Sequence, residues 1–462
     1  MRDAAKPVLF VSLPEAGLVN GMLVLARETA RHAAVDVWFA TDEPQRARIE
    51  SEPELTFASL GEVVSEMSAQ SWDEKVYRQV TGRSRFRSHH AVLKHAYRPR
   101  LWQQKYRRLE ALVDKVNPAV MVIDCEARFA ISLAVARGIP YVLTVPFLPS
   151  YMLASHPPFA RSCVPRGFPV PFTGLPLRMS LRQRLTNRLF KAWTLAVLLD
   201  PRIGRSLRAD LDFHKSIGIP PPGRLAQVDR AELVLCSTVA ELDYPIALPE
   251  NVRTVGAILP PVPERPGGDL EAWLDGRPST VYIGLGTITR LTRAQVAAVV
   301  EVARRLDGAH QVLWKLPAGL HALLPDALPG NLRVESWVPS QLDVLAHPHV
   351  TAFVTHGGGN GFNEGLYFGK PMVVRPLWAD NHDVAVRGQD RGVSLTLDDP
   401  HTIDPDDLTD KLMRVLGDPG YRERSARFGA LQRRAGGRET AAGLILALPQ
   451  LAARDGAEQA AP

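Results

Sequence analysis

The chain has 462 residues, of which 45% are hydrophobic and 23% are charged, and its formal net charge is +6. This balance is typical of a globular protein and excludes a disordered or fibrous chain, while the length predicts two large domains rather than one. Three widely spaced cysteines exclude a disulfide framework, and no run approaches the ~20 apolar residues of a membrane span. Because the N-terminus also lacks the pattern of a signal peptide, we expect a cytoplasmic protein.

Apolar strands alternate with amphipathic helices along the first half of the chain. This alternation predicts a parallel sheet that is covered by helices on both faces. The segments that follow the pattern are, in order, PVLFVSL, GMLVLARETARHA, VDVWFAT, PAVMVIDC, FAISLAVARG and PYVLTVPF.

A strongly basic stretch lies within this half. Residues 76–110 contain ten Lys or Arg against the single Glu110. Such a local charge attracts an anionic acceptor or a lipid surface, and it is also typical of a solvated helical face. Nucleic acid is not an expected partner, because no recognised DNA-binding or RNA-binding motif accompanies the charge.

The rhythm is broken over residues 147–225, where Pro-rich loops surround a basic amphipathic segment at residues 178–199. An insertion after a strand end commonly builds a pocket wall. The amphipathic segment has two open interpretations: it rests on an anionic membrane as a peripheral contact, or it packs on its own domain.

The second half repeats the alternation of strands and helices, so the fold class is α/β with two doubly wound parallel-sheet domains. The Pro-rich and Gly-rich segment DYPIALPENVRTVGAILPPVPERPGGD suits a linker and places the boundary near residue 250. We therefore expect domains at residues 1–250 and 251–435. A C-terminal helix at about residues 436–462 is expected to pack back on the first domain.

The most informative stretch is THGGGNGFNEG, which begins at Thr355 where an apolar strand hands over to a helix. A helix N-terminus at a strand end offers unpaired N–H groups to a phosphate, and glycines let the backbone approach it closely. A carboxylate one helical turn further on can accept hydrogen bonds from ribose hydroxyls. The pattern predicts a nucleoside diphosphate, held by His356, Gly357, Gly358, Gly359, Asn360 and Glu364.

The residues around this turn extend the pattern. The full set resembles the nucleotide-sugar signature of the UDP-glycosyltransferase family with the GT-B fold, and most closely its bacterial natural-product members. That set is Trp337, Pro339, Gln341, His347, Pro348, Thr355, His356, Gly358, Asn360, Glu364, Gly369, Pro371, Pro376 and Asp380.

The resemblance implies a role for each matching residue. Trp337 stacks on the base and Gln341 contacts it, while His356 and nearby backbone amides hold the diphosphate. Glu364 binds the ribose. Asp380 and Asn381 contact sugar hydroxyls, and Gly286 and Thr287 face the phosphates. No metal and no cofactor beyond the nucleotide sugar are implied, because a helix dipole and His356 can stabilise the leaving diphosphate.

Three positions depart from the family pattern. Ser340 is an extra residue before Gln341, which puts the glutamine's contact with the base in doubt. Gly361 replaces a hydroxyl residue of the phosphate cradle, and Asn381 replaces a glutamine. The identity of the sugar and the choice between UDP and dTDP stay open.

A fourth departure concerns the general base that removes the acceptor's proton. The family places a histidine after the first strand and orients it with an aspartate; here Leu18 stands in its place, while Asp124 is present. Three explanations stay open. Asp124 or Glu15 is the base, or the acceptor arrives already ionised, or the protein binds a nucleotide sugar without efficient transfer. His89, His90 and His156 are further histidines that could approach the acceptor.

The sequence thus predicts a metal-independent, inverting hexosyltransferase-type glycosyltransferase. Its donor is a UDP or dTDP sugar, and its acceptor is a small hydrophobic, natural-product or lipid-like molecule, either neutral or anionic. The alternative from a different class is a catalytically impaired auxiliary protein, which Leu18 motivates. A nucleotide-sugar 2-epimerase shares the architecture but needs several acid and base residues and no acceptor.

Overall fold

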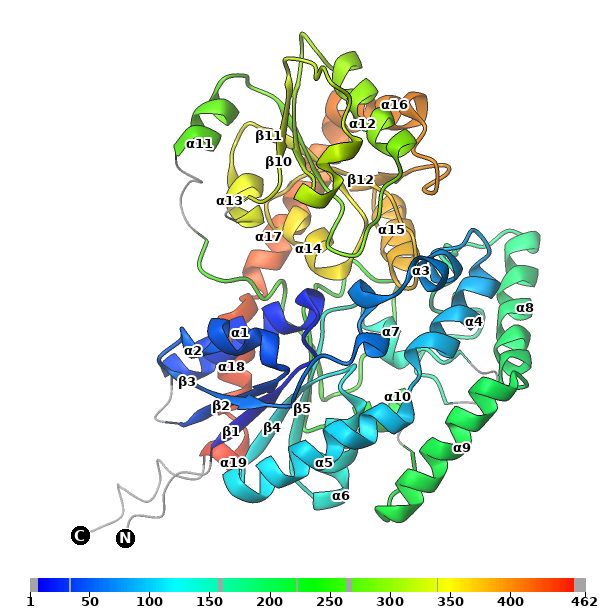
Figure 1. Cartoon of the computed structure of the whole chain (residues 1–462), viewed down its shortest axis with the longest axis vertical. Coiled ribbons are helices and arrows are strands. Elements are labelled where there is room, and N and C mark those ends of the chain that lie inside the picture. Colours follow the sequence, from blue (N-terminus) through cyan, green and yellow to red (C-terminus); the bar gives the residue numbers. More distant parts are fainter. Residues whose placement is uncertain are drawn as a thin grey trace.

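The structure is a computed structural model that describes residues 7–32, 35–156, 161–221, 223–262, 268–338 and 340–452. It contains two parallel sheets, one above the other in Figure 1. Their strands read as almost continuous apolar runs because helices cover both faces of each sheet. Within the described residues, no helix is long and apolar enough to cross a membrane.

The first sheet has seven strands in the order β3-β2-β1-β4-β5-β6-β7. Its strands are β1 (Val8–Val11), β2 (Val37–Thr41), β3 (Leu55–Ser59), β4 (Val120–Asp124), β5 (Tyr141–Val145), β6 (Leu233–Cys236) and β7 (Val252–Thr254). The last strand therefore lies just beyond residue 250, where the sequence places the domain boundary.

In the described residues, ten α-helices lie between β1 and β7 along the chain. They are α1 (Ala16–His32), α2 (Arg46–Glu50), α3 (Glu74–Val80), α4 (Arg85–Ala96), α5 (Pro99–Val116), α6 (Arg128–Arg137), α7 (Ser150–Leu153), α8 (Leu181–Val197), α9 (Pro201–Ser216) and α10 (Arg224–Arg230). The basic stretch forms α3, α4 and α5. It is only partly solvated, because Lys105 is buried against the carboxylate of Asp42.

The second sheet has six strands in the order β10-β9-β8-β11-β12-β13. They are β8 (Thr280–Gly284), β9 (Gln311–Lys315), β10 (Leu332–Glu335), β11 (Val350–Thr355), β12 (Met372–Val374) and β13 (Ser394–Thr396). The helices that follow β7 are α11 (Gly268–Asp275), α12 (Arg293–Arg305), α13 (Gln341–Ala346), α14 (Gly359–Tyr367), α15 (Asn381–Asp390), α16 (Pro405–Gly417), α17 (Pro419–Arg434), α18 (Gly437–Leu446) and α19 (Pro449–Ala452).

The end of the chain returns to the first domain. Ala441, Ala442 and Ile445 of α18 are buried in one apolar cluster with Leu23 of α1. In Figure 1 this helix, in red, lies beside α1 in the lower half. Residues 453–462 of the expected C-terminal helix lie outside the described residues.

Strand order determines where a ligand can enter each sheet. β1 pairs with both β2 and β4, and β8 pairs with both β9 and β11. The direction of winding therefore reverses between β1 and β4 in the first sheet and between β8 and β11 in the second. Ligands of open α/β sheets bind outside the carboxyl ends of strands at such a reversal. The two reversals face each other, one from each domain, across a shared cleft.

Buried contacts hold the two domains in this arrangement. Nε of Arg387 in α15 donates to Oδ1 of Asp243 at 2.9 Å, and both side chains are almost completely buried. The carboxylate of Asp383 accepts hydrogen bonds from the backbone N–H groups of Phe172 at 2.6 Å and Gly174 at 2.9 Å. These polar contacts fix α15 against the insertion and against the segment that follows β6 in the first domain.

Candidate active site

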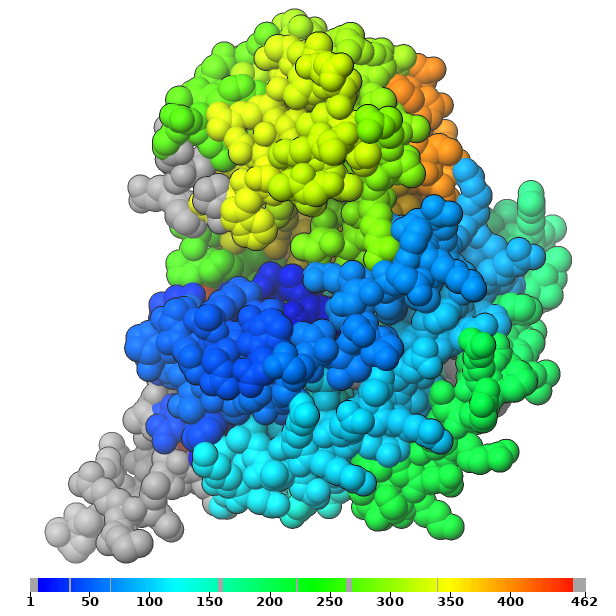
Figure 2. All heavy atoms as spheres, in the orientation of Figure 1, coloured from blue at the N-terminus to red at the C-terminus, as the bar shows by residue number. Residues whose placement is uncertain are grey.

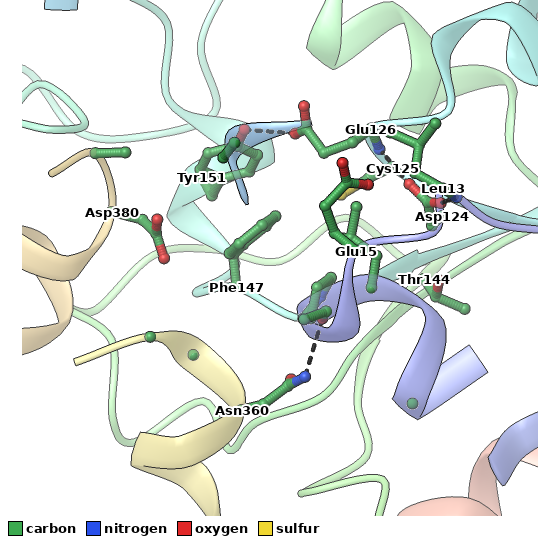
Figure 3. A pocket seen from close by; sticks show the side chains of 18 of the residues that line it. Leu13, Glu15, Asp124, Cys125, Glu126, Thr144, Phe147, Tyr151, Asn360 and Asp380 are labelled. Atoms are coloured by element: carbon green, nitrogen blue, oxygen red, sulfur yellow. Dashed lines mark hydrogen bonds between the residues drawn. The ribbon is translucent and has the colours of Figure 1, made fainter. Parts of the chain in front are cut away.

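The cleft between the domains has a volume of about 1500 Å³. The segments that follow β1, β4 and β5 line it from the first domain, and those that follow β8 and β11 line it from the second. Figure 3 shows where the two domains meet, with Glu15 and Asp124 of the first domain facing Asn360 and Asp380 of the second. Apart from Gly357 and His90, the site residues predicted from the sequence line this one cleft.

His356 sits immediately after β11 and is enclosed by two glycines. A β-carbon at Gly286 would lie 2.5 Å from Cε1 of His356, and one at Gly358 would also fall inside van der Waals contact of the ring. Gly286 additionally has a φ of +77°, which favours glycine. The GLGT segment and the THGGG segment thus each supply one wall around the imidazole.

Burial keeps this imidazole neutral, because it lowers the pKa of His356 to about 4, with Arg375 contributing in the same direction. Within the described residues, Nδ1 of His356 is buried and has no hydrogen-bond partner. A buried polar atom without a partner is costly unless a ligand or water meets it. The ring is therefore suited to a hydrogen bond with a bound phosphate.

The start of α14 forms the rest of the cradle. Gly358 is the N-cap with φ −64° and ψ 141°, so the N–H groups of the first helical turn point out of the helix end. A β-carbon at Gly359 would collide with the carbonyl oxygen of Pro146, after β5 of the first domain. The two glycines thus serve different purposes: one admits the His356 ring, and the other lets α14 approach the opposite domain.

Asn360 crosses the cleft. Its Nδ2 donates to the carbonyl oxygen of Gly17, in the first turn of α1, at 2.9 Å. The sequence predicts Asn360 as a donor to the diphosphate, and one of its two N–H groups is instead engaged with the first domain. This bond places the phosphate cradle directly beside the segment that carries Glu15.

Glu364 lies one turn along α14 and is held by Gln341. Nε2 of Gln341 donates to Oε2 of Glu364 at 2.5 Å, while its Oε1 accepts from the hydroxyl of Tyr282 at 3.1 Å. Burial raises the pKa of Glu364, and the hydrogen bond from Gln341 opposes that rise. Gln341 therefore orients a carboxylate, and the contact of Gln341 with the base that the family resemblance implies stays a prediction.

Ser340 directly precedes Gln341. It is the N-cap of α13 and accepts a hydrogen bond from the backbone N–H of Asp343 at 3.3 Å, so the helix begins at Gln341. Trp337 stands at the rim, 67% exposed, with Nζ of Lys315 4.5 Å from its ring centroid. An exposed ring at the mouth of the cleft is positioned to stack on a planar base.

The start of α15 places two further polar groups beside the cradle. Burial raises the pKa of Asp380 to about 7, and the neighbouring Asp383 adds to the effect. Oδ1 of Asn381 is buried without a hydrogen-bond partner among the described residues. Thr287 is engaged across the domains, since its Oγ1 accepts from Nε2 of Gln70 at 3.2 Å.

On the opposite bank, Asp124 ends β4 and is 1% exposed. Its Oδ2 accepts from the backbone N–H of Leu13 at 2.6 Å, and its Oδ1 accepts from those of Glu126 at 2.8 Å and Ala127 at 2.9 Å. Both oxygens are thus occupied by backbone donors. This geometry argues against Asp124 as the base and favours a positioning role, because Leu13 begins the loop that carries Glu15.

Glu15 is the better-placed carboxylate. It precedes α1, and its carbonyl oxygen accepts from the N–H groups of Leu18 and Val19. Its Oε2 is buried and has no hydrogen-bond partner in the described parts of the chain. Burial raises the pKa of Glu15 to about 7, with the charge of Asp124 adding to the rise. In Figure 3 its carboxylate lies near the centre of the cleft.

Sequence reasoning missed a polar group that lines the same cleft as Glu15. The hydroxyl of Tyr151 donates to Oε1 of Glu126 at 2.5 Å and accepts from Nη2 of Arg224 at 2.8 Å. The Arg224 guanidinium also lies 4.0 Å from the Tyr151 ring centroid. These residues come from three separate segments, and no local pattern in the sequence links them.

The histidines of the first domain form an apolar wall instead. His89 and His156 are stacked with ring centroids 5.1 Å apart, and both lie within 6 Å of the Phe172 ring. Burial lowers the pKa of His89 to about 4 and that of His156 well below its usual value. His90 is turned away from them, with Nε2 2.8 Å from Oδ2 of Asp200.

Two facing, doubly wound parallel-sheet domains with a ligand cleft between their strand reversals define the GT-B architecture. The sequence matches the family described as UDP-glucoronosyl and UDP-glucosyl transferase over residues 56–434, and the chain belongs to that family.

Curated relatives are similar over about two thirds of this chain. Human UDP-glucuronosyltransferase 2B7 is 28% identical over 326 residues, which are 67% of this chain and 57% of that protein. UDP-glucuronosyltransferase 2B13 of Oryctolagus cuniculus is 29% identical over 328 residues, which are 67% of this chain and 58% of that protein. The chain thus spans a little over half the length of these relatives.

Solved structures match along nearly the whole chain. The glycotransferase of kitacinnamycin has a TM-score of 0.70 at 22% identity and covers 95% of this chain and 98% of its own. The UDP-glucose: anthocyanidin 3-O-glucosyltransferase in complex with UDP has a TM-score of 0.67 at 17% identity, covering 97% and 99%. At these identities the likeness shows the fold.

Proposed function

We propose that the protein is an inverting glycosyltransferase that moves a sugar from a UDP or dTDP sugar to a hydroxyl of a hydrophobic acceptor. One observation carries this proposal. A neutral His356 ring and the N-terminal end of α14 face the same cleft as the Glu15 carboxylate. The hydrogen bond from Asn360 to Gly17 joins the two domains at this point.

The second domain holds the donor. Trp337 stacks on the base, Glu364 accepts from the ribose hydroxyls, and Asp380 and Asn381 contact the sugar. As the bond from the sugar to the diphosphate breaks, negative charge collects on the leaving phosphate. The N–H groups at the start of α14 and a hydrogen bond from His356 stabilise that charge.

The first domain holds the acceptor and removes its proton. The acceptor oxygen attacks the anomeric carbon from the face opposite the diphosphate, which inverts the configuration, and its proton passes to Glu15. A base is most effective when its pKa is close to the working pH, and burial brings the pKa of Glu15 to about 7. Asp124 fastens the loop that carries Glu15. Because Glu15 supplies the base, no histidine is needed at position 18.

The apolar part of the cleft indicates the kind of acceptor. Phe147, Phe172 and the stacked pair of His89 and His156 form a large nonpolar wall, which suits an aromatic or polycyclic natural product or a lipid-like molecule. The thiols Cys125 and Cys236 are buried and unbonded, which is compatible with the cytoplasmic location that we propose.

Incubation with radiolabelled nucleotide sugars and pools of hydrophobic acceptors tests the activity. We expect label in an acceptor product of inverted anomeric configuration and release of UDP or dTDP. UDP binding without transfer or donor hydrolysis, across a broad acceptor pool, would instead support an auxiliary donor-binding protein, the function that Leu18 in place of histidine favours. Conversion of the donor sugar without any acceptor would indicate an epimerase.

A further inference from the structure

The helix α8 presents a row of leucines to solvent. Leu181 is 82% exposed, Leu185 57% and Leu189 52%, and Leu199 just beyond the helix is 83% exposed. Ala192 and Ala196 continue the row on the exposed side. With 3.6 residues per turn, the apolar positions from Leu181 to Ala196 fall within an arc of about 80°.

These leucines are not needed to attach α8 to its domain, because its opposite face already does so. Asn187, Phe190, Thr194 and Val197 are buried on that face. The side chain of Asn187 accepts from the N–H of Val170 at 2.8 Å and donates to the carbonyl of Phe168 at 3.0 Å. The helix therefore packs on its own domain and still has a second, unpartnered apolar face.

Positive charges border the leucine row. No Asp or Glu occurs from residue 177 to residue 199, and five cations lie in this interval: Arg178, Arg182, Arg184, Arg188 and Lys191. On a helical projection, Arg182 lies on one side of the row, and Arg184, Arg188 and Lys191 lie on the other. The exposed face is thus a narrow apolar strip with cations along both margins.

We propose that this face of α8 docks on an anionic lipid bilayer. An amphipathic helix lies in the membrane interface when its leucines enter the acyl boundary and its flanking arginines reach lipid phosphates. The helix has 17 residues, so it offers a contact about 26 Å long. Figure 2 shows it along the outer right-hand edge of the molecule, where a flat surface can reach it.

A second copy of the chain fits the same face poorly. Two copies meeting through α8 about a twofold axis would bring two sets of five cations together without an intervening carboxylate. A bilayer rich in acidic lipid supplies the opposite charge along the whole face. Charge complementarity therefore favours the membrane over self-association.

Docking in this way would also bring the acceptor side of the cleft close to the lipid. Thr194, on the inner face of α8, and Leu198, which follows it, both line the cleft. A lipid-like acceptor could then pass from the bilayer to the cleft along one helix. This consequence rests on the proposed function, whereas membrane binding by α8 does not.

Co-sedimentation of the full chain with vesicles tests the proposal. We expect binding to vesicles of phosphatidylcholine mixed with phosphatidylglycerol, little binding to phosphatidylcholine alone, and weakening of the interaction at high salt. The variant Leu181→Ser/Leu185→Ser/Leu189→Ser should bind at least about tenfold more weakly. Arg182→Gln/Arg188→Gln should lose roughly tenfold to thirtyfold, with a smaller salt dependence.

Met413→Ser is the matched control, because Met413 is 48% exposed on α16 of the second domain and should leave vesicle binding unchanged. UDP-induced thermal shifts, which do not depend on α8, check that each variant is folded. The proposal is overturned if the wild type ignores anionic vesicles, or if the leucine variant binds them as well as the wild type does. It is also overturned if the lipid-free protein forms a dimer that the leucine substitutions abolish.

Discussion

Replacing Glu15 with glutamine should make the protein more stable and less active. The carboxylate is buried in the cleft with an unpartnered oxygen, and burial raises its pKa from 4.5 to about 7. The raised pKa means that the folded state holds the proton more tightly than the unfolded state does. The stabilising contribution of this proton is complete below pH 4.5 and is lost as the pH rises through about 7.

The size of the effect follows from the shift. A change of about 2.5 pKa units at 1.36 kcal/mol each corresponds to a charging cost on the order of 3 kcal/mol at pH 8. Glutamine carries no charge, so Glu15→Gln should recover most of that free energy of unfolding at pH 8 and almost none at pH 4. Urea unfolding at the two pH values measures the difference.

The same substitution removes the proposed base, whose loss typically lowers turnover by about 10² to 10⁴-fold. In the wild type, kcat/KM should rise with pH and level off above about pH 8, because the carboxylate must be ionised to accept a proton. UDP binding should persist in the variant, as measured by thermal shift. Glu423→Gln, on an exposed position of α17, should change neither property.

Two outcomes would refute this reasoning. Turnover of Glu15→Gln within a few-fold of the wild type would exclude Glu15 as the base. An unchanged free energy of unfolding at pH 8 would show that the carboxylate is not buried in the way the structure describes. Unchanged turnover would favour the alternative in which the acceptor arrives already ionised and needs no base.

Three further substitutions test the rest of the cleft. Gly358→Ala should abolish the UDP-induced thermal shift, because the new β-carbon collides with His356, whereas Gly443→Ala, which has open space, should leave the shift intact. Trp337→Ala should weaken UDP binding by about 1–3 kcal/mol, measured by calorimetry, and undiminished affinity would show that the base stacks elsewhere. Asp124→Ala leaves three buried backbone N–H groups without their acceptor and should lower the free energy of unfolding by at least about 2 kcal/mol, a loss that chemical denaturation measures and that unaltered stability would contradict.

Much of the fold follows from the sequence for a physical reason. Strands buried on both faces must be apolar throughout, and helices on a sheet must be amphipathic, so both leave periodic patterns in the chain. The phosphate cradle can also be predicted from the sequence, because His356, the glycines and Glu364 lie within one short segment. Their relative positions are fixed by a single strand and the first turns of a single helix.

Contacts between distant segments leave no such pattern. Asn360 bonds to Gly17, and Arg224 bonds to Tyr151, only because two domains and an insertion meet at the cleft. The hydrogen bond from the backbone N–H of Leu13 to Oδ2 of Asp124 also depends on how β1 and β4 lie side by side. The sequence of a strand-end aspartate therefore gives no sign that a backbone N–H from another strand donates to one of its oxygens.

Leu18 and Glu15 can be understood as one coupled change. Glu15 immediately precedes α1 and Leu18 lies in its first turn, and the N–H of Leu18 bonds to the carbonyl of Glu15. Leu18 and Glu15 line the same cleft, and desolvation by burial is the largest cause of the raised pKa of Glu15. A histidine at position 18 could serve as a base itself, but it would admit water and add charge beside Glu15. We infer that an apolar residue in place of the expected base favours the buried environment that raises the pKa of the neighbouring glutamate.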